Sequence, residues 1–224
     1  MFCVLCRYFI KWTDPGWDVT AEEVTNELLW QGLNTDSLFE ADANPVRLRE
    51  IAELQQSNPT QAFAEFLRLA ENGSVWSMIQ VGYAYATGEG VRVDRVQAEK
   101  WYLAAHNKGS DYGLLQAGIL AIRRHDTTQA RALFSEGITR GLPRAKTYLA
   151  WVEREFGSRK EACILYEQAI ASSDLLAEIG FARARAFGRF GFGAIPNGIR
   201  DLIKAKLKFV ALVDERHRSL SSNP

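Results

Sequence analysis

Residues 81–109 read VGYAYATGEGVRVDRVQAEKWYLAAHNKG, and this stretch decides the fold of the chain. The residues up to Tyr85 carry apolar or small side chains at the three-and-four spacing of one helical face. Gly88 and Gly90 then stop that helix, because glycine readily adopts positive φ. Asp94 is placed to cap a second helix, which runs to about Asn107. The stretch therefore predicts a hairpin of two helices.

The second helix of this hairpin contains a pattern that recurs along the chain at intervals of 36, 32 and 32 residues. Each copy begins with an alanine, has an aromatic residue four positions later and has a helix stopper eleven positions later. The alanines are Ala62, Ala98, Ala130 and Ala162; the rings are Phe66, Tyr102, Phe134 and Tyr166; the stoppers are Gly73, Gly109, Gly141 and, as a substitute, Ser173. A small residue lets two helices approach closely, and the ring fills the space one turn later. Self-similarity at this period predicts a solenoid of helical hairpins.

The best-matched unit also carries a family resemblance. Its pattern is Val81-Gly82-x-x-Tyr85-x-x-Gly88-x-Gly90-Val91-x-x-Asp94-x-x-x-Ala98-x-x-Trp101-Tyr102-x-x-Ala105-x-x-x-Gly109. This closely resembles the Sel1-like repeat, a relative of the tetratricopeptide repeat. The next units depart from the family pattern, since Arg123-Arg124-His125-Asp126 replaces the glycine-rich turn. The resemblance implies an all-α fold, a right-handed superhelical solenoid of antiparallel helix hairpins, with protein–protein interaction as its usual use.

Three regions follow from this reading of the chain. Residues 1–40 lie outside the repeat, and we expect them to pack on the array, since rings such as Trp12 and Trp17 need a surface to cover. Residues 41–213 form the solenoid of about five hairpins. The first hairpin is expected at Pro45–Gln55 and Pro59–Asn72, and the last helix at about 198–213. Residues 214–224 are expected to be a polar tail.

Composition bounds the class of protein. The chain has 224 residues, of which 47% are hydrophobic and 24% charged, as in ordinary globular proteins. No apolar run approaches the length of a membrane helix, and the first ten residues lack the features of a secretory signal. We therefore expect a cytoplasmic protein that makes no membrane contact. The resemblance to the Sel1-like repeat implies a bacterial protein.

Charge is distributed unevenly although the net charge is zero. Residues 1–75 hold 12 acidic and 5 basic side chains, a net charge of −7, and residues 76–224 hold 15 acidic and 22 basic side chains, a net charge of +7. This asymmetry predicts either an anionic partner for the repeats or attraction between the two parts of the chain.

Residues suited to catalysis or metal binding are sparse. Cys3 and Cys6 form a C-x-x-C without a second ligand pair, so we expect no metal or cofactor. The histidines His106, His125 and His217 lie far apart in the sequence, and no phosphate-binding loop is present. The pI of about 6.8 argues against nucleic-acid binding. We therefore do not expect an enzyme.

A binding site is expected on the concave face of the solenoid, which the first helices of each pair line in the family that the chain resembles. Its candidate residues are Trp76, Ile79, Tyr83, Tyr112, Leu115, Ile119, Arg144, Trp151 and Arg154. One hypothesis places a peptide or helix of a partner protein in this groove, with its acidic groups at the Arg144 and Arg154 end. A second places the acidic N-terminal segment there. A shift of one residue in register would instead put some of these side chains in the core. Family analogy alone adds a further alternative, a regulator of surface polysaccharide or envelope biogenesis.

Overall fold

Helices form the regular structure of the computed structural model, which describes residues 33–142 and 144–221. The first described element is the short helix α2 (Thr35–Glu40). The helices that follow are α3 (Pro45–Ser57), α4 (Pro59–Glu71), α5 (Val75–Thr87), α6 (Arg95–Asn107), α7 (Asp111–Arg123), α8 (Thr127–Thr139), α9 (Ala145–Phe156), α10 (Arg159–Ala171), α11 (Leu175–Ala186), the 3-10 turn η3 (Phe192–Ala194) and α12 (Ile195–Ser221).

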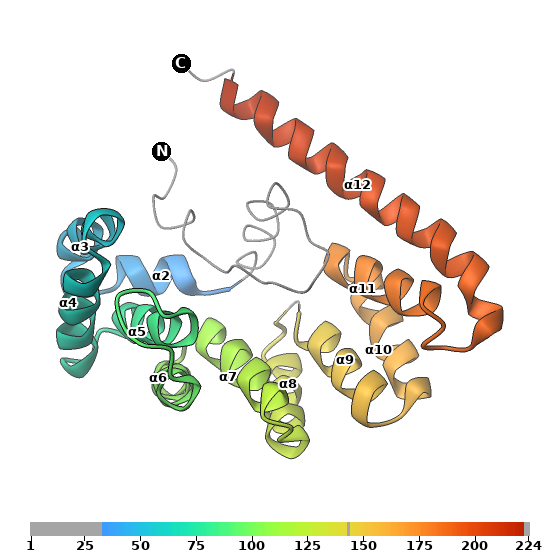
Figure 1. Ribbon diagram of the computed structural model, residues 1–224, viewed down its shortest axis with the longest axis horizontal. Helices are drawn as coiled ribbons and strands as arrows, with labels where there is room; N and C mark the ends of the chain where they lie inside the picture. The colour runs from blue at the N-terminus through green and yellow to red at the C-terminus, as the bar shows by residue number, and fades with distance from the viewer. Residues whose placement is uncertain (1–32, 143, 222–224) are drawn as a thin grey trace.

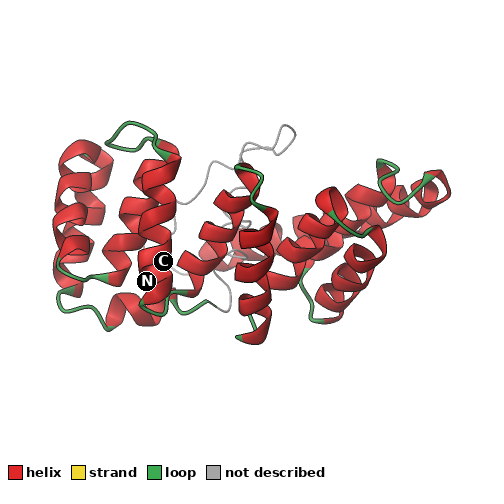
Figure 2. Ribbon diagram, turned by 90° about the horizontal axis from the view of Figure 1, so that it is seen from below, coloured by secondary structure: helices red, strands yellow, loops and turns green. Residues whose placement is uncertain are grey.

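Helices α3 to α12 make five consecutive hairpins, and each helix also packs on the next one along the chain. Figure 1 shows the hairpins arranged in an arc, with α6, α8 and α10 on its outer side. The view from below shows the successive pairs standing side by side (Figure 2). The prediction of an all-α solenoid of helix hairpins is confirmed for the part of the chain that the structure describes.

The recurring alanine and aromatic pair explains how each hairpin closes. All four repeat alanines are fully buried. In the second hairpin the ring of Tyr102 on α6 lies against Gly82 on α5, where an added Cβ would be 2.9 Å from ring carbons. In the third, the ring of Phe134 on α8 lies against Gly118 on α7, at 2.6 Å from such a Cβ. Each large ring thus needs a very small residue on the opposite helix.

The stopper that ends each repeat lies in the left-handed region of backbone conformation. Gly141 has φ of 77°, and its counterpart one repeat later, Ser173, has φ of 63°. The prediction that Ser173 substitutes for glycine is therefore confirmed. His125, in the turn without glycines, has φ of 66°. Non-glycine residues adopt this conformation at a cost, which the surrounding packing must offset.

Most helices begin at a side chain that caps them. Asp94 accepts hydrogen bonds from the backbone N–H groups of Val96 and Gln97, both at 3.0 Å, as its position in the sequence predicts. The residues that cap helices by side-chain hydrogen bonds are Asn44, Asn58, Ser74, Asp94, Ser110, Asp126, Ser158 and Asp174. Helix α9 differs, because its N-cap residue Arg144 makes no such bond.

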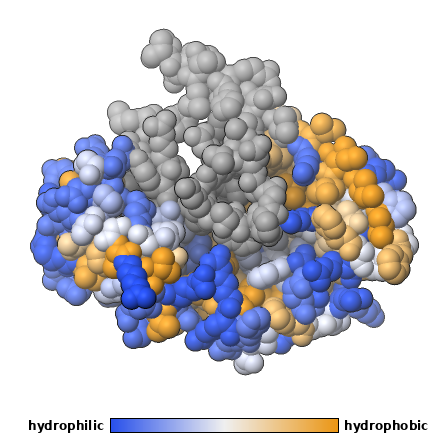
Figure 3. Space-filling model, in the orientation of Figure 1, coloured by the Kyte–Doolittle hydropathy of each residue, from blue (hydrophilic) through white to orange (hydrophobic). Residues whose placement is uncertain are grey.

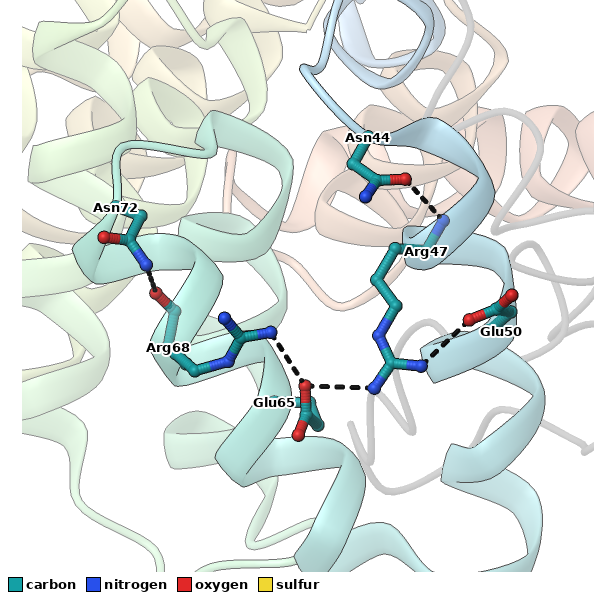
Figure 4. Close-up of polar contacts among 6 residues, drawn as sticks. All are labelled: Asn44, Arg47, Glu50, Glu65, Arg68 and Asn72. Carbon is teal, nitrogen blue, oxygen red and sulfur yellow. Dashed lines mark hydrogen bonds and ion pairs between the residues drawn. The ribbon is translucent and has the colours of Figure 1, made fainter.

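The first hairpin carries an ion-pair network on its surface (Figure 4). The guanidinium of Arg47 on α3 donates to Glu50 at 2.9 Å and to Glu65 on α4 at 3.1 Å. Arg68 donates to the same Glu65 carboxylate at 3.2 Å. The hydrogen bond from Arg47 is the main reason that the pKa of Glu65 lies below its usual range. Because the network joins α3 to α4 at the surface, it orients the hairpin and contributes little stability.

Helix α2 crosses from the second hairpin toward the third. The ring of Phe39 packs edge-on against Trp76 of α5, with centroids 5.3 Å apart. Asn34 donates to the Gly109 carbonyl at 2.7 Å and accepts from the Asp111 N–H at 3.1 Å. Residues 34–39 therefore contact the array at two places. The rest of the expected N-terminal docking segment, residues 1–32, lies outside the described residues.

The last helix is longer than the sequence pattern suggests. Helix α12 runs from Ile195 to Ser221, whereas we expected it to end near Val213 and to be followed by a polar tail. The segment after Val213 contains no glycine or proline before Pro224, and its arginines and glutamate are good helix formers. Polarity alone was thus a poor sign of a helix end.

Candidate partner-binding face

The nine candidate groove residues separate into a buried group and a more accessible group. Seven of them are buried, Arg144 among them, and the other six belong to the main hydrophobic core cluster: Trp76, Ile79, Tyr83, Tyr112, Leu115 and Ile119. These six lie on α5 and α7. Their burial agrees with the alternative, raised from the sequence, that some groove positions are core positions.

The remaining three candidates lie on or next to α9. Trp151 and Arg154 are partly exposed, while Arg144 is only 6% exposed. The positions one repeat of 32 residues further on, Leu176 and Arg183 of α11, are also partly exposed. Figure 1 shows α9 and α11 following one another along the arc. The partly exposed positions among the described residues of the predicted groove therefore lie on α9 and α11.

Arg144 is a buried cation with unused hydrogen-bonding capacity. Its Nε and Nη1 atoms are buried and have no hydrogen-bond partner. Burial lowers the pKa of its guanidinium, and the neighbouring Tyr148 and Asp174 act in the opposite direction. Burying N–H donors without acceptors costs free energy, so this group attracts an oxygen acceptor such as water or a carboxylate.

Asp174 supplies the negative charge near Arg144 and joins two repeats. One carboxylate oxygen accepts from the Thr147 hydroxyl of α9 at 2.5 Å. The other accepts from the N–H groups of Leu176 and Ala177 at 2.9 and 3.4 Å, which caps α11. Through this carboxylate the relative position of α9 and α11 is set by hydrogen bonds as well as by packing.

An aromatic cluster lies beside Arg154. Its guanidinium donates to the Tyr166 hydroxyl at 3.2 Å and pairs with Glu155 at 2.9 Å. The Tyr166 ring stacks on the Phe181 ring with centroids 5.3 Å apart. The guanidinium of Arg185 lies over the Phe181 ring, 5.4 Å from its centroid. Sequence reasoning missed Phe181 and Arg185, because the fifth hairpin has diverged from the repeat. Their signal was the ring and arginine spacing within residues 181–185.

Cys163, His106 and His125 pack against neighbouring side chains of the solenoid. Burial raises the pKa of the Cys163 thiol, which is the opposite of what an activated thiolate needs. Burial lowers the pKa of His106, whose Nε2 lies 3.4 Å from Glu136, and the His125 ring packs edge-on against Phe156 at 6.0 Å. Within 33–142 and 144–221, no group of three or more His, Cys, Asp or Glu side chains could hold a metal. Cys3 and Cys6 lie outside these ranges.

Among the described residues, no helix is both long enough and apolar enough to cross a membrane.

Comparisons with known proteins bear on the fold. No family model matches the chain, and no curated protein matches it. A solved structure of a protective antigen from uropathogenic Escherichia coli with an SLR fold is similar to it, at 15% identity and a TM-score of 0.57, over 86% of this chain and 49% of that one. A Sel1 repeat protein from Oxalobacter formigenes matches at 22% identity and a TM-score of 0.49, over 65% of this chain and 64% of that one.

The chain thus spans about half of the antigen's length and less than two thirds of the Oxalobacter protein. At these identities the likeness concerns the fold and not the activity. The hairpin geometry, the recurring alanines and the antigen's structure agree: this chain has the fold of a Sel1-like repeat solenoid.

Proposed function

We propose that the chain is a non-catalytic scaffold that binds an acidic segment of a partner protein on the α9–α11 face. This face consists of Thr147, Trp151, Arg154, Leu176 and Arg183. The three residues of α9 share one side of that helix, because they are spaced by four and three positions. Arg183 corresponds to Trp151 one repeat later. The expected cytoplasmic location belongs to the same proposal.

The observation that carries the proposal is the difference in exposure along the inner side. The equivalent residues of α5 and α7 are buried in the core, whereas all five residues of the α9–α11 face are partly exposed. Tryptophan and arginine are the residues most enriched at binding hot spots. A half-buried tryptophan between two arginines supports recognition of a short segment with an apolar anchor next to carboxylates.

Charge supports an acidic partner. Residues 76–224 carry a net charge of +7. Arg154 is 15% exposed at its side chain and already fixed by Tyr166 and Glu155, so little rotamer entropy is lost when it binds. Carboxylates pair with such a guanidinium through short charge-assisted hydrogen bonds. The buried Arg144, at the start of α9, adds positive potential to the same face.

Peptide selection against the intact chain tests the proposal. We expect a random peptide library to yield acidic sequences that contain an apolar residue. Arg154→Glu should weaken the binding of these peptides by about tenfold or more, since it replaces an attraction by a repulsion. Isothermal titration calorimetry measures the change.

The matched control is Lys160→Glu on the exposed side of α10, which alters the net charge by the same amount. This variant should bind the peptides within about twofold of the parent chain, because surface charges far from a site act weakly at physiological salt. Equal losses in both variants would show a general charge effect and would refute a site on the α9–α11 face. Selection of basic or purely apolar peptides would refute it as well.

A further inference from the structure

Helix α12 has a second apolar side in addition to the one that packs on the solenoid. Leu202, Ala205 and Phe209 face α11 and join a hydrophobic cluster there. On the other side of the same helix, Ile199, Ile203 and Leu207 follow one another at intervals of four residues. These three residues, here called the α12 stripe, are 50%, 56% and 65% exposed. The spacing places them on one line along the helix, directed away from α11.

The stripe forms part of a larger hydrophobic surface. Figure 1 shows α12 as a long straight helix whose C-terminal half extends beyond α11. Hydrophobic surface gathers over the N-terminal half of α12, at the right of Figure 3. The connection before α12 adds Phe187 and Phe192, which are 73% and 89% exposed. Contiguous exposed apolar surface of this kind marks an interaction site.

Basic side chains border the stripe on both edges. Residues 199–208 contain four basic residues and one acidic residue. At 100° per residue, Lys206 lies on one edge of the stripe, and Arg200 and Lys204 lie on the other. Asp201 pairs with Arg185 at 2.9 Å and with Arg200 at 3.4 Å, and Lys208 pairs with Glu178 at 2.7 Å, which leaves Lys204 and Lys206 as the bordering cations without an ion pair to a described residue. The outward face of α12 thus presents aliphatic side chains between exposed cations.

The charge and shape of this face favour one kind of binding partner over another. A second copy of the chain, packed symmetrically on the stripe, would bring its own Lys204 and Lys206 against the same two lysines. An anionic bilayer has no such conflict. A convex helix can sink aliphatic side chains into the headgroup region, while the lysine stems reach up to the phosphates.

We propose that the outward face of α12 binds the surface of an anionic lipid bilayer, with the helix lying parallel to the membrane plane. This proposal replaces the expectation, drawn from the sequence, that the chain makes no membrane contact. The stripe enters the boundary between headgroups and acyl chains, and the bordering cations contact lipid phosphates. The solenoid lies on the other side of α12, so this contact does not involve the α9–α11 face.

Vesicle co-sedimentation of the intact chain tests the inference. We expect binding to vesicles of phosphatidylcholine mixed with phosphatidylglycerol, little binding to phosphatidylcholine alone, and weaker binding as salt increases. The double variant Ile203→Glu with Leu207→Glu should lose affinity by about tenfold or more. Lys204→Gln and Lys206→Gln should each lose about fivefold, the effect of one cation near an anionic surface.

The control is the double variant Val93→Glu with Val96→Glu, which introduces the same two charges at exposed valines around the start of α6, 50% and 64% exposed. It should bind vesicles like the parent chain. Arg154→Glu should also bind them, even where it loses its peptides, so the two proposals can fail separately. Circular dichroism confirms that each variant is folded.

Absence of binding to the anionic vesicles overturns the inference, and so does equal binding by the stripe variant. Equal binding to neutral and anionic vesicles overturns the role of the cations. A dimer in sedimentation velocity that the stripe variant converts to monomer, without vesicle binding, would identify a second copy as the occupant.

Discussion

At the scale of single residues, close contacts between a ring and a glycine hold the second and third hairpins together. Phe134 occupies the space that a side chain at position 118 would need, and Tyr102 does the same at position 82. A glycine that faces a ring of the neighbouring hairpin differs. A Cβ at Gly180 of α11 would lie 3.7 Å from Tyr166 of α10, which is ordinary van der Waals contact.

This difference predicts opposite effects of the same substitution. Gly118→Ala should destabilise the protein by about 1–3 kcal/mol, because overpacking against Phe134 exceeds the gain in helix propensity. Gly180→Ala meets no such obstacle and should stabilise the protein by up to about 1 kcal/mol. Urea unfolding measures both free energies. A loss of stability in both variants, or in neither, would contradict the packing argument.

At the scale of elements, some helix caps bond only to their own helix, while others also bond to a neighbouring helix. Asp94 is exposed and caps only α6. Asp174 is 8% exposed, caps α11 and accepts the Thr147 hydroxyl of α9. Its carboxylate also lies near the buried guanidinium of Arg144, for which it is an opposing charge. Asp174 therefore caps α11, bonds to α9 and opposes the charge of Arg144, whereas Asp94 only caps α6.

The two caps therefore predict unequal losses. Asp94→Ala should cost about 1 kcal/mol, the usual effect of removing an N-cap. Asp174→Ala should cost about 2–3 kcal/mol, because a buried hydrogen bond and the charge beside Arg144 are lost together with the cap. Thermal unfolding followed by circular dichroism ranks them. Equal losses would mean that the bond to Thr147 contributes nothing.

At the scale of the whole molecule, the hydrophobic core is divided unevenly. One cluster of buried residues extends from α2 to α9, and smaller clusters hold α9 to α11 and α11 to α12. Repeat arrays are stabilised mainly by contacts between neighbouring units, so a small cluster can open while a large one stays closed.

Hydrogen exchange should show this division. We expect backbone amides in α11 and α12 to exchange faster than those in α5 to α8, because opening the last hairpin exposes only the smaller clusters. Mass spectrometry of peptides from the exchanged intact chain gives the comparison. Uniform protection across both regions would show that the array unfolds as a single cooperative unit and would contradict the prediction.

Local residue patterns allowed much of the fold to be predicted, and this follows from the short range of the interactions involved. Ala98, Tyr102 and Gly109 lie within one helix and its end, so their roles depend on neighbours in the sequence. The left-handed conformation of Ser173 was also predictable from its position in the period. The end of α12 was not, because a polar helix and a polar tail have similar composition.

The candidate site was less accessible to sequence reasoning. Trp76 and Trp151 both lie on the first helix of a hairpin, and the pattern predicts that both line the groove. Trp76 is buried against Phe39 of α2, which lies outside the repeat, while Trp151 stays partly exposed. That contact joins residues far apart in the chain, and no periodicity within the repeats could predict it.

The sequence by itself determined that the chain is helical, the caps and turns that separate the helices of the repeats, and the stacking of hairpins into a solenoid. These depend on capping, turn conformation and the packing of adjacent helices, all of which act between near neighbours. Only the tertiary structure decided which part of the inner side is accessible and that α12 presents an apolar stripe edged by cations. Exposure depends on what lies opposite each residue, and that is a property of the assembled molecule.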